Sequence, residues 1–146
     1  MPSTIKTAHV TWSGSLTEGK GEITSTGSGA LPRLPVSWKD RTSEGAATSP
    51  EELIAAAHAA CFSMALSAGL DRAGHAPTRL DVEAACTFEV GEGGARIASM
   101  RLTLTGDVPG LDEAGLRLAA EGAKNNCPVS KALQGNVDIA LEVRSG

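Results

Sequence analysis

One long apolar segment constrains the fold of this chain more than any other feature. The stretch SPEELIAAAHAACFSMALSAGLDR, residues 49–72, is rich in alanine and apolar on nearly every side of a helix. Ser49 suits the N-cap and Pro50 the first helical position, and Glu52 completes a capping box with Ser49. The pattern predicts a helix of about 22 residues, about 33 Å long, that Gly74 stops. Because this helix is apolar all round, we expect it to be buried at the centre of the fold.

Short strands are predicted before this helix. Residues 5–12 and 21–26 have the composition of two strands around the polar turn SGSLTEGKG, and residues 34–38 suit a third strand. Residues 39–49, KDRTSEGAATS, are small and polar, which predicts an exposed loop.

The pattern of apolar residues changes after the helix. Apolar residues then alternate with polar ones, which indicates half-buried strands in a hairpin. The predicted elements are a strand at 80–90, a GEGG turn at 91–94, a second strand at 98–105, helices at 112–124 and 128–133, and a closing strand at 137–143. This order predicts one α+β domain over residues 1–146, with antiparallel sheets.

Composition excludes several classes of function. The chain of 146 residues has a net charge of −4, only 3% aromatic residues and no tyrosine, which disfavours nucleic-acid binding. Its length allows a real core without disulfides or metals. The N-terminal sequence shows no secretory signal, and no apolar stretch approaches about 20 residues. We therefore expect a cytoplasmic protein that neither spans nor binds a membrane.

The three cysteines do not form a metal-binding or scaffold pattern. Their number is odd, their spacings are wide, and no CxxC pair occurs. A disulfide scaffold, a zinc ribbon and a thioredoxin motif are therefore disfavoured. Cys86 lies in phase with the apolar residues of its strand, which favours a packing role.

Cys61 lies within the long apolar segment, three residues after His58, so the two side chains share a helical face. Cys61 is either a thiol whose pKa is set by its neighbours or one more small residue among alanines. A single histidine on a packed helix is more often a hydrogen-bonded structural residue than a catalyst.

Cys127 has a more distinctive context, because it directly precedes Pro128 in KNNCPVSKAL. Proline favours the first helical position, so Cys127 would cap a short helix, where the helix dipole lowers a thiol pKa. If Cys127 meets Cys61, one thiol could be oxidised by a peroxide to a sulfenic acid and the other could condense with it to a disulfide. Periodicity does not show whether the two meet.

Two stretches, TSPEELIAAAHAACFSMAL and NNCPVSKAL, resemble the signature stretches of the OsmC family, the osmotically inducible proteins related to the organic hydroperoxide resistance (Ohr) proteins. The resemblance extends to VTWSGSLTEGKGEI, which is similar to the family's opening hairpin, and to DRTSEGAATSPEEL, which is similar to its arginine-bearing loop. VPGLDEAGLRLAAEGAKNNCPVSKAL resembles the family's second helix and the segment after it, so the likeness covers nearly the whole chain.

The resemblance implies a thiol-dependent peroxidase that protects against oxidative stress. Such enzymes reduce organic hydroperoxides, and hydrogen peroxide less well, without a cofactor or metal. The positions that match the family's functional residues are Cys61 as nucleophile, Cys127 as resolving thiol, Arg41 in the loop and Glu51 as its acidic partner. No arginine precedes Arg33. Arg41 therefore fits the OsmC pattern rather than the Ohr pattern, in which the arginine lies near the N-terminus.

The resemblance also implies an assembly and a reductant. The family forms an intertwined homodimer in which sheets wrap two central helices, with active sites at the subunit interface. Its reductants are small dithiols or lipoyl groups carried on proteins.

The implied chemistry is physically reasonable. Arg41 stays protonated at physiological pH, would favour the thiolate of Cys61 and could donate hydrogen bonds to the peroxide oxygens. Glu51 could hold the guanidinium in a two-point contact. Apolar residues near Cys61 could form a pocket for an alkyl tail or could simply pack in the core, namely Leu53, Ile54, Phe62 and Met64.

The length of the predicted helix limits which residues can meet within one chain. Glu51 and Cys61 would lie about 15 Å apart along its axis, on faces that differ by about 80°. One arginine does not easily touch both side chains. We therefore expect Cys61 of one subunit to meet Glu51, together with Arg41, of the other.

Three other functions compete with the peroxidase. A redox sensor would use the same thiols but oxidise once and stop, whereas a structural dimer would keep both thiols packed and inert. A Cys-His hydrolase could pair His58 with Cys61, but the sequence contains no visible orienting group or oxyanion hole.

Overall fold

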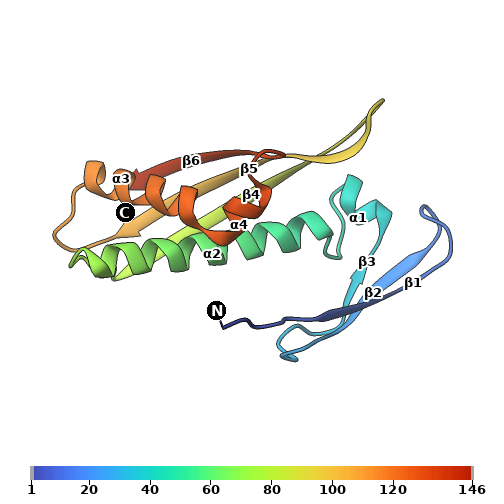
Figure 1. Cartoon of the computed structure of the whole chain (residues 1–146). Coiled ribbons are helices and arrows are strands. Elements are labelled where there is room, and N and C mark those ends of the chain that lie inside the picture. The colour runs from blue at the N-terminus through green and yellow to red at the C-terminus, as the bar shows by residue number, and fades with distance from the viewer. Residues whose placement is uncertain (1, 146) are drawn as a thin grey trace. The chain divides into compact units, whose positions relative to one another are not determined.

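The computed structural model describes residues 2–145. The chain forms two compact units that divide after Pro50, and each contains a three-stranded sheet (Figure 1). The α+β class is as predicted, while the assignment of the chain to a single domain stays a prediction.

The first unit contains an antiparallel sheet in the order β1-β2-β3. Its strands are β1 (Ala8–Ser13), β2 (Lys20–Thr26) and β3 (Leu34–Val36). Register pairs such as Trp12 with Gly21 join β1 to β2, so the predicted opening hairpin is confirmed.

The segment after β3 corrects the prediction of a loop over residues 39–49. A short helix, α1 (Trp38–Thr42), begins there, because the Ser37 hydroxyl at the N-cap accepts a hydrogen bond from the Asp40 N–H. Residues 43–49 contain no helix or strand beyond an isolated bridge between Thr48 and Val36. A five-residue helix has too few positions to show helical periodicity, so the sequence pattern missed it.

The second unit is built on helix α2 (Pro50–Arg72), whose predicted bounds are confirmed. Gly74 follows with a φ of 84°, a conformation that favours glycine and ends the helix. The expectation that the helix is buried on all sides is wrong for the single chain. Its buried residues form one face, whereas Met64 on another face is 68% exposed.

Helix α2 is also long and apolar enough, by length and composition, to cross a membrane. Its most apolar window has a mean hydropathy of 1.7, and 22% of that window is buried. The sequence expectation that no stretch approaches this length is therefore corrected. The core helix of a soluble protein passes the same test, so the measure alone is weak evidence for a membrane span.

A second sheet, in the order β4-β5-β6, faces α2. It consists of β4 (Arg79–Gly91), β5 (Gly94–Asp107) and β6 (Asp138–Ser145). Strands β4 and β5 form the predicted antiparallel hairpin, but β6 pairs with β5 in parallel, which corrects the prediction of purely antiparallel sheets. Alternation of apolar residues reports which face is buried and not the direction of a strand, so the sequence pattern could not distinguish the two pairings.

The parallel pairing follows from the connection between β5 and β6. Parallel neighbours need a crossover of a dozen or more residues, usually helical. Helices α3 (Glu113–Asn126) and α4 (Pro128–Leu133) fill this connection. Asp112 begins α3 by accepting a hydrogen bond from the Gly115 N–H at 2.8 Å.

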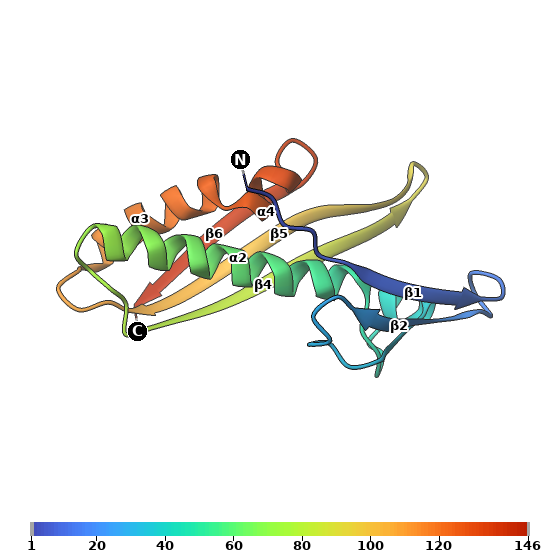
Figure 2. The ribbon, with the colours of Figure 1, turned by 60° about the horizontal axis from the view of Figure 1, so that its bottom comes forward.

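The second unit therefore has two layers. Figure 2 shows α2 and α3 side by side over one face of the sheet. Side chains from both helices and the sheet form one core, which includes Phe62, Leu66, Leu70, Leu102, Leu104, Leu116, Ala120, Cys127 and Val143. This packing holds α4 and the residues before it against the middle of α2.

Candidate active site

The structure brings Cys61 and Cys127 together. Cys61 lies in the middle of α2 and is half-buried, whereas Cys127 lies between α3 and α4 and is fully buried. The two thiols lie close enough for each to act on the ionisation of the other, Cys61 packs against the core cluster that contains Cys127, and no disulfide joins them. The contact that periodicity could not show is therefore present within one chain.

Cys127 occupies the position that its sequence predicts. Its backbone N–H donates to the Ala123 carbonyl at 2.8 Å, so it ends α3, and Pro128 then begins α4. The neutral Cys127 side chain makes no cap hydrogen bond to α4, but the N–H groups of Val129 and Ser130 lie where they stabilise its thiolate.

The two thiols have pKa values shifted in opposite directions. Burial raises the pKa of Cys61, and the hydrogen bond with Cys127 raises it further, while the Val129 N–H partly offsets both effects. Burial alone would also raise the pKa of Cys127, but hydrogen bonds from Cys61, Ser130 and Val129 together lower it. Within this pair the proton therefore stays on Cys61, and Cys127 ionises more easily.

His58 contacts Ser130, a residue that was not predicted from the sequence as part of the site. Its Nε2 lies 2.7 Å from the Ser130 hydroxyl, and both side chains are buried. Burial lowers the pKa of His58, which favours the neutral imidazole. Because Nε2 pairs with Ser130 rather than Cys61, the geometry argues against a Cys-His hydrolase dyad. Ser130 is the third residue of α4, and a side chain at that position can reach back to the N-cap residue, Cys127. This spacing of three residues was the sequence signal that could have identified Ser130 as a site residue.

Glu51 and Cys86 both lie in the second unit, and Glu51 acts electrostatically on Cys86. Glu51 is buried in the first turn of α2 although it carries a carboxylate. Burial raises the pKa of Cys86, and the charge of Glu51 raises it further. Cys86 is half-buried in the alternating pattern of β4, as predicted for a packing residue.

Arg41 lies in the first unit, on α1. Its guanidinium carbon lies 5.6 Å from the centre of the Trp38 ring, which is a cation–π contact. Asp40 organises the surrounding loop, because its carboxylate accepts hydrogen bonds from the Ser37 hydroxyl and, at 3.4 Å, from the Ala47 N–H. A side chain at Gly45 would collide with this carboxylate. Arg41 was predicted from the sequence as a site residue, whereas Asp40 was not.

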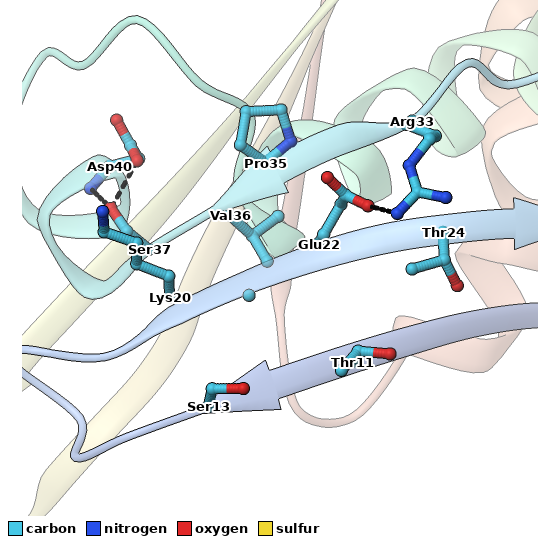
Figure 3. Close-up of a pocket in the computed structure, with 11 residues that line it drawn as sticks. Thr11, Ser13, Lys20, Glu22, Thr24, Arg33, Pro35, Val36, Ser37 and Asp40 are labelled. Atoms are coloured by element: carbon cyan, nitrogen blue, oxygen red, sulfur yellow. Dashed lines mark hydrogen bonds and ion pairs between the residues drawn. The ribbon is translucent and has the colours of Figure 1, made fainter.

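Two open hollows are lined by described residues of the first unit. One, of about 400 Å³, is lined mainly by apolar side chains together with the Arg41 side chain, namely Trp12, Leu16, Val36, Ser37, Trp38, Arg41 and Pro50. A second hollow, of about 570 Å³, lies over the sheet and contains the ion pair between Arg33 and Glu22 (Figure 3). Only the first hollow combines apolar walls with a candidate site residue.

Of the four residues expected near an alkyl tail, Phe62 is fully buried in the core, so packing explains it. Met64 is 68% exposed, and Leu53 and Ile54 are half-buried. Within residues 2–145, no group of three His, Cys, Asp or Glu side chains is arranged to hold a metal ion.

Comparison with known proteins agrees with this geometry. The profile of the family described as OsmC-like protein matches residues 43–142. Peroxiredoxin OsmC of Escherichia coli (strain K12) is 38% identical over 140 residues, which cover 96% of this chain and 97% of that protein. An organic hydroperoxide resistance protein of Xanthomonas axonopodis pv. citri is 34% identical over 66% of this chain and 67% of its own length.

A solved structure supports the same fold. The crystal structure of the organic hydroperoxide resistance protein OhrB of Bacillus subtilis superposes with a TM-score of 0.74 at 29% identity. The match covers 94% of this chain and 98% of that one. The long apolar helix α2 is thus the core helix of a known soluble fold rather than an isolated apolar segment.

Proposed function

This chain belongs to the OsmC-like protein family, and from that membership we propose that it is a cysteine-based peroxidase that reduces organic hydroperoxides to alcohols. Hydrogen peroxide is a poorer substrate. The observation that carries the proposal is the contact between the half-buried thiol of Cys61 and the buried thiol of Cys127. Two thiols in contact can form a disulfide after only a small movement.

Cys61 attacks the hydroperoxide, because its thiol is partly open whereas Cys127 is fully buried. The Cys61 thiolate bonds to the terminal oxygen, the O–O bond breaks, and the alkoxide leaves and takes a proton to become the alcohol. Cys61 is then a sulfenic acid. The Cys127 sulfur bonds to the Cys61 sulfur, hydroxide leaves as water, and a disulfide remains.

Positive charge is needed at Cys61, because its surroundings in the second unit raise its pKa. Arg41 supplies this charge, and Glu51 orients its guanidinium. The protein acts as a homodimer, and the Glu51 and Arg41 that serve one Cys61 come from the partner subunit. The apolar and partly exposed face of α2 supports the dimer, since burying that face against a second copy removes it from water.

The hollow beside Arg41 supports an organic substrate. Its walls include Trp12, Leu16 and Trp38, so it suits an alkyl or aryl group whose peroxide end faces the guanidinium. A dithiol, either free or as a lipoyl group on a protein, reduces the disulfide and becomes oxidised itself. The enzyme works in the cytoplasm as a defence against oxidative stress.

The test is consumption of cumene hydroperoxide in the presence of dihydrolipoamide, for the native chain and for Cys61→Ser and Cys127→Ser. Native protein should turn over many times, and Cys61→Ser should not react. Cys127→Ser should oxidise once and stall, because its sulfenic acid has no resolving thiol.

The same assay separates the competing functions. A redox sensor would consume about one equivalent of peroxide per chain and stop, even with the dithiol present. A structural dimer would consume none. Either result from native protein would overturn the peroxidase proposal.

A further inference from the structure

Gly21 is a buried strand residue whose lack of a side chain leaves room for a neighbouring indole. It lies in the middle of a row across the first sheet, paired with Trp12 on β1 and with Val36 on β3. A methyl group at this position would lie 2.5 Å from the Trp12 ring and 2.8 Å from the Val36 side chain. The backbone φ of Gly21 is outside the left-handed region, so close approach rather than backbone conformation explains the glycine.

The indole of Trp12 is fixed at both of its rings. An edge of its six-membered ring lies over Gly21. In the five-membered ring, Nε1–H donates a hydrogen bond to the Gly14 carbonyl at 2.9 Å. An aromatic side chain that is already held in one orientation loses little conformational entropy when a ligand packs against it.

The exposed part of this indole forms a wall of the hollow beside Arg41. Trp12 keeps 41% of its surface exposed, and the hollow that it lines also includes Leu16 and Trp38. Trp12 and Trp38 are the two tryptophans of the chain, which has no tyrosine. The Arg41 guanidinium carbon lies 5.6 Å from the centre of the Trp38 ring. The hollow therefore contains one indole beside the cation and a second indole with surface open to a ligand.

We propose that Trp12 is a specificity-determining residue, held in place by Gly21, which selects hydroperoxides whose organic group carries a planar aromatic ring. The inference rests on the proposed peroxidase function and names its substrate class. A planar ring packs against the fixed indole in an offset or edge-to-face arrangement, which binds more tightly than burial of its apolar area alone would provide. The peroxide end of the same molecule then faces the Arg41 guanidinium.

Two substrates differ only in the group that Trp12 is expected to bind. Cumene hydroperoxide is tert-butyl hydroperoxide with a phenyl ring in place of one methyl group, and native protein should have the higher kcat/KM for it. Trp12→Leu keeps an apolar side chain but removes the indole. It should lower the ratio of the two kcat/KM values about fivefold, the effect of losing one aromatic pair. Trp12→Phe keeps a ring and should stay closer to the native ratio.

Gly21→Ala tests the support of the ring without removing any side chain from the hollow. The added methyl group displaces the Trp12 ring, so this variant should lower the same ratio about as far as Trp12→Leu does. The matched control is Gly91→Ala, at a glycine of β4 where an added methyl group meets nothing within 4 Å, and it should keep the native ratio. Equal losses for both substrates, or unchanged ratios, in Trp12→Leu and Gly21→Ala overturn the proposal.

A final measurement does not depend on peroxidase activity. In the NMR spectrum of isotope-labelled protein, the two tryptophans give two indole N–H signals, which Trp38→Phe assigns. Cumyl alcohol, the alcohol that reduction of cumene hydroperoxide yields, should shift the Trp12 signal to saturation, whereas tert-butanol at the same concentrations should not. Gly21→Ala should raise the Kd for cumyl alcohol about fivefold. Absence of a saturable shift in the native chain overturns the proposal.

The two sets of results separate this inference from the peroxidase function. If cumyl alcohol shifts the Trp12 signal although native protein does not turn over, the peroxidase function fails while the aromatic selectivity of Trp12 stands. If native protein turns over but its Trp12 signal does not respond, the selectivity fails while the peroxidase function stands. Should Trp12→Leu or Gly21→Ala not fold, the titration of the native chain still decides the proposal.

Discussion

The thiols of Cys61 and Cys127 contact each other within a single chain, and the Val129 N–H acts on both sulfurs. Cys61 is carried by the long helix α2, and Cys127 by the junction of two later helices. The shared N–H lies at the start of α4, so one backbone donor can stabilise negative charge on either thiol. The pair is therefore arranged for a disulfide inside one subunit.

We predict that oxidation forms this disulfide within the chain and not between chains. One equivalent of hydroperoxide should lower the mass of the intact chain by two hydrogens, and the oxidised protein should migrate as a monomer on a non-reducing gel. Cys86→Ser should behave in the same way, because Cys86 lies on β4 and its pKa is raised by burial and Glu51 rather than by either thiol of the pair. A disulfide-linked dimer, or a disulfide that includes Cys86, would contradict the contact.

Mixed dimers should test whether each site uses both subunits. Cys61→Ser and Glu51→Gln should each be inactive or severely impaired alone. A mixed dimer contains one chain of each variant. If Glu51 serves the Cys61 of the partner subunit, the native Glu51 of one chain and the native Cys61 of the other form one intact site. Mixing the two variants after partial unfolding should then restore activity. About 15 Å of helix separates the two residues in one chain, which favours this result.

Failure to restore activity would show that both residues serve the same chain. Exchange itself needs a control, and a differently tagged native chain should form mixed dimers under the same conditions.

Charge in the hollow beside Arg41 should change substrate preference. Leu16 lines this hollow and is 55% exposed, so Leu16→Asp should leave the fold intact. We expect the KM for cumene hydroperoxide to rise about tenfold, because an organic group would lie against a carboxylate. The KM for hydrogen peroxide should stay the same, since it has no apolar part. Equal changes for both substrates would exclude the hollow as the binding place of the organic group.

Removal of the Asp40 carboxylate should disturb α1, which carries Arg41, and the loop that follows it. Asp40→Ala removes the acceptor for the Ser37 hydroxyl and the Ala47 N–H. We expect kcat/KM for cumene hydroperoxide to fall about tenfold through poorer positioning, with the rate of disulfide formation unchanged. The matched control is Asp112→Ala, which removes the cap of α3 and should cost about 1 kcal/mol of stability with little effect on kcat/KM. Equal losses of kcat/KM in both variants would point to general destabilisation.

Stability should fall in mild acid because of His58. Burial lowers the pKa of His58 below its ordinary value of 6.5, so the unfolded chain takes up a proton there before the folded chain does. The free energy of unfolding should therefore decrease as the pH falls below about 6.5, by up to about 1.4 kcal/mol per pH unit until the folded pKa is reached. Denaturant titrations at several pH values measure this slope. His58→Gln should flatten it, and an identical slope in that variant would assign the effect to other groups.

The candidate site could be predicted only in part. Cys127 was recognisable because its cap position is set by the next residue, Pro128, and Cys61 because a thiol stands out in an alanine-rich helix. Ser130 was missed although its spacing from Cys127 was an available signal, because its partner His58 lies 72 positions away in the sequence. Asp40 was missed for a related reason, since the sequence predicted a loop where its carboxylate organises α1.

Helix α2 from Pro50 to Arg72 and the β4–β5 hairpin could be predicted from local patterns, because caps, alternation and turn residues act over a few neighbouring positions. The parallel pairing of β5 with β6 and the proximity of Cys61 to Cys127 are visible only in the folded chain. The same is true of the face of α2 that the single chain leaves exposed. These features depend on burial between segments far apart in the chain, and burial is non-directional, so local patterns do not encode which segments meet.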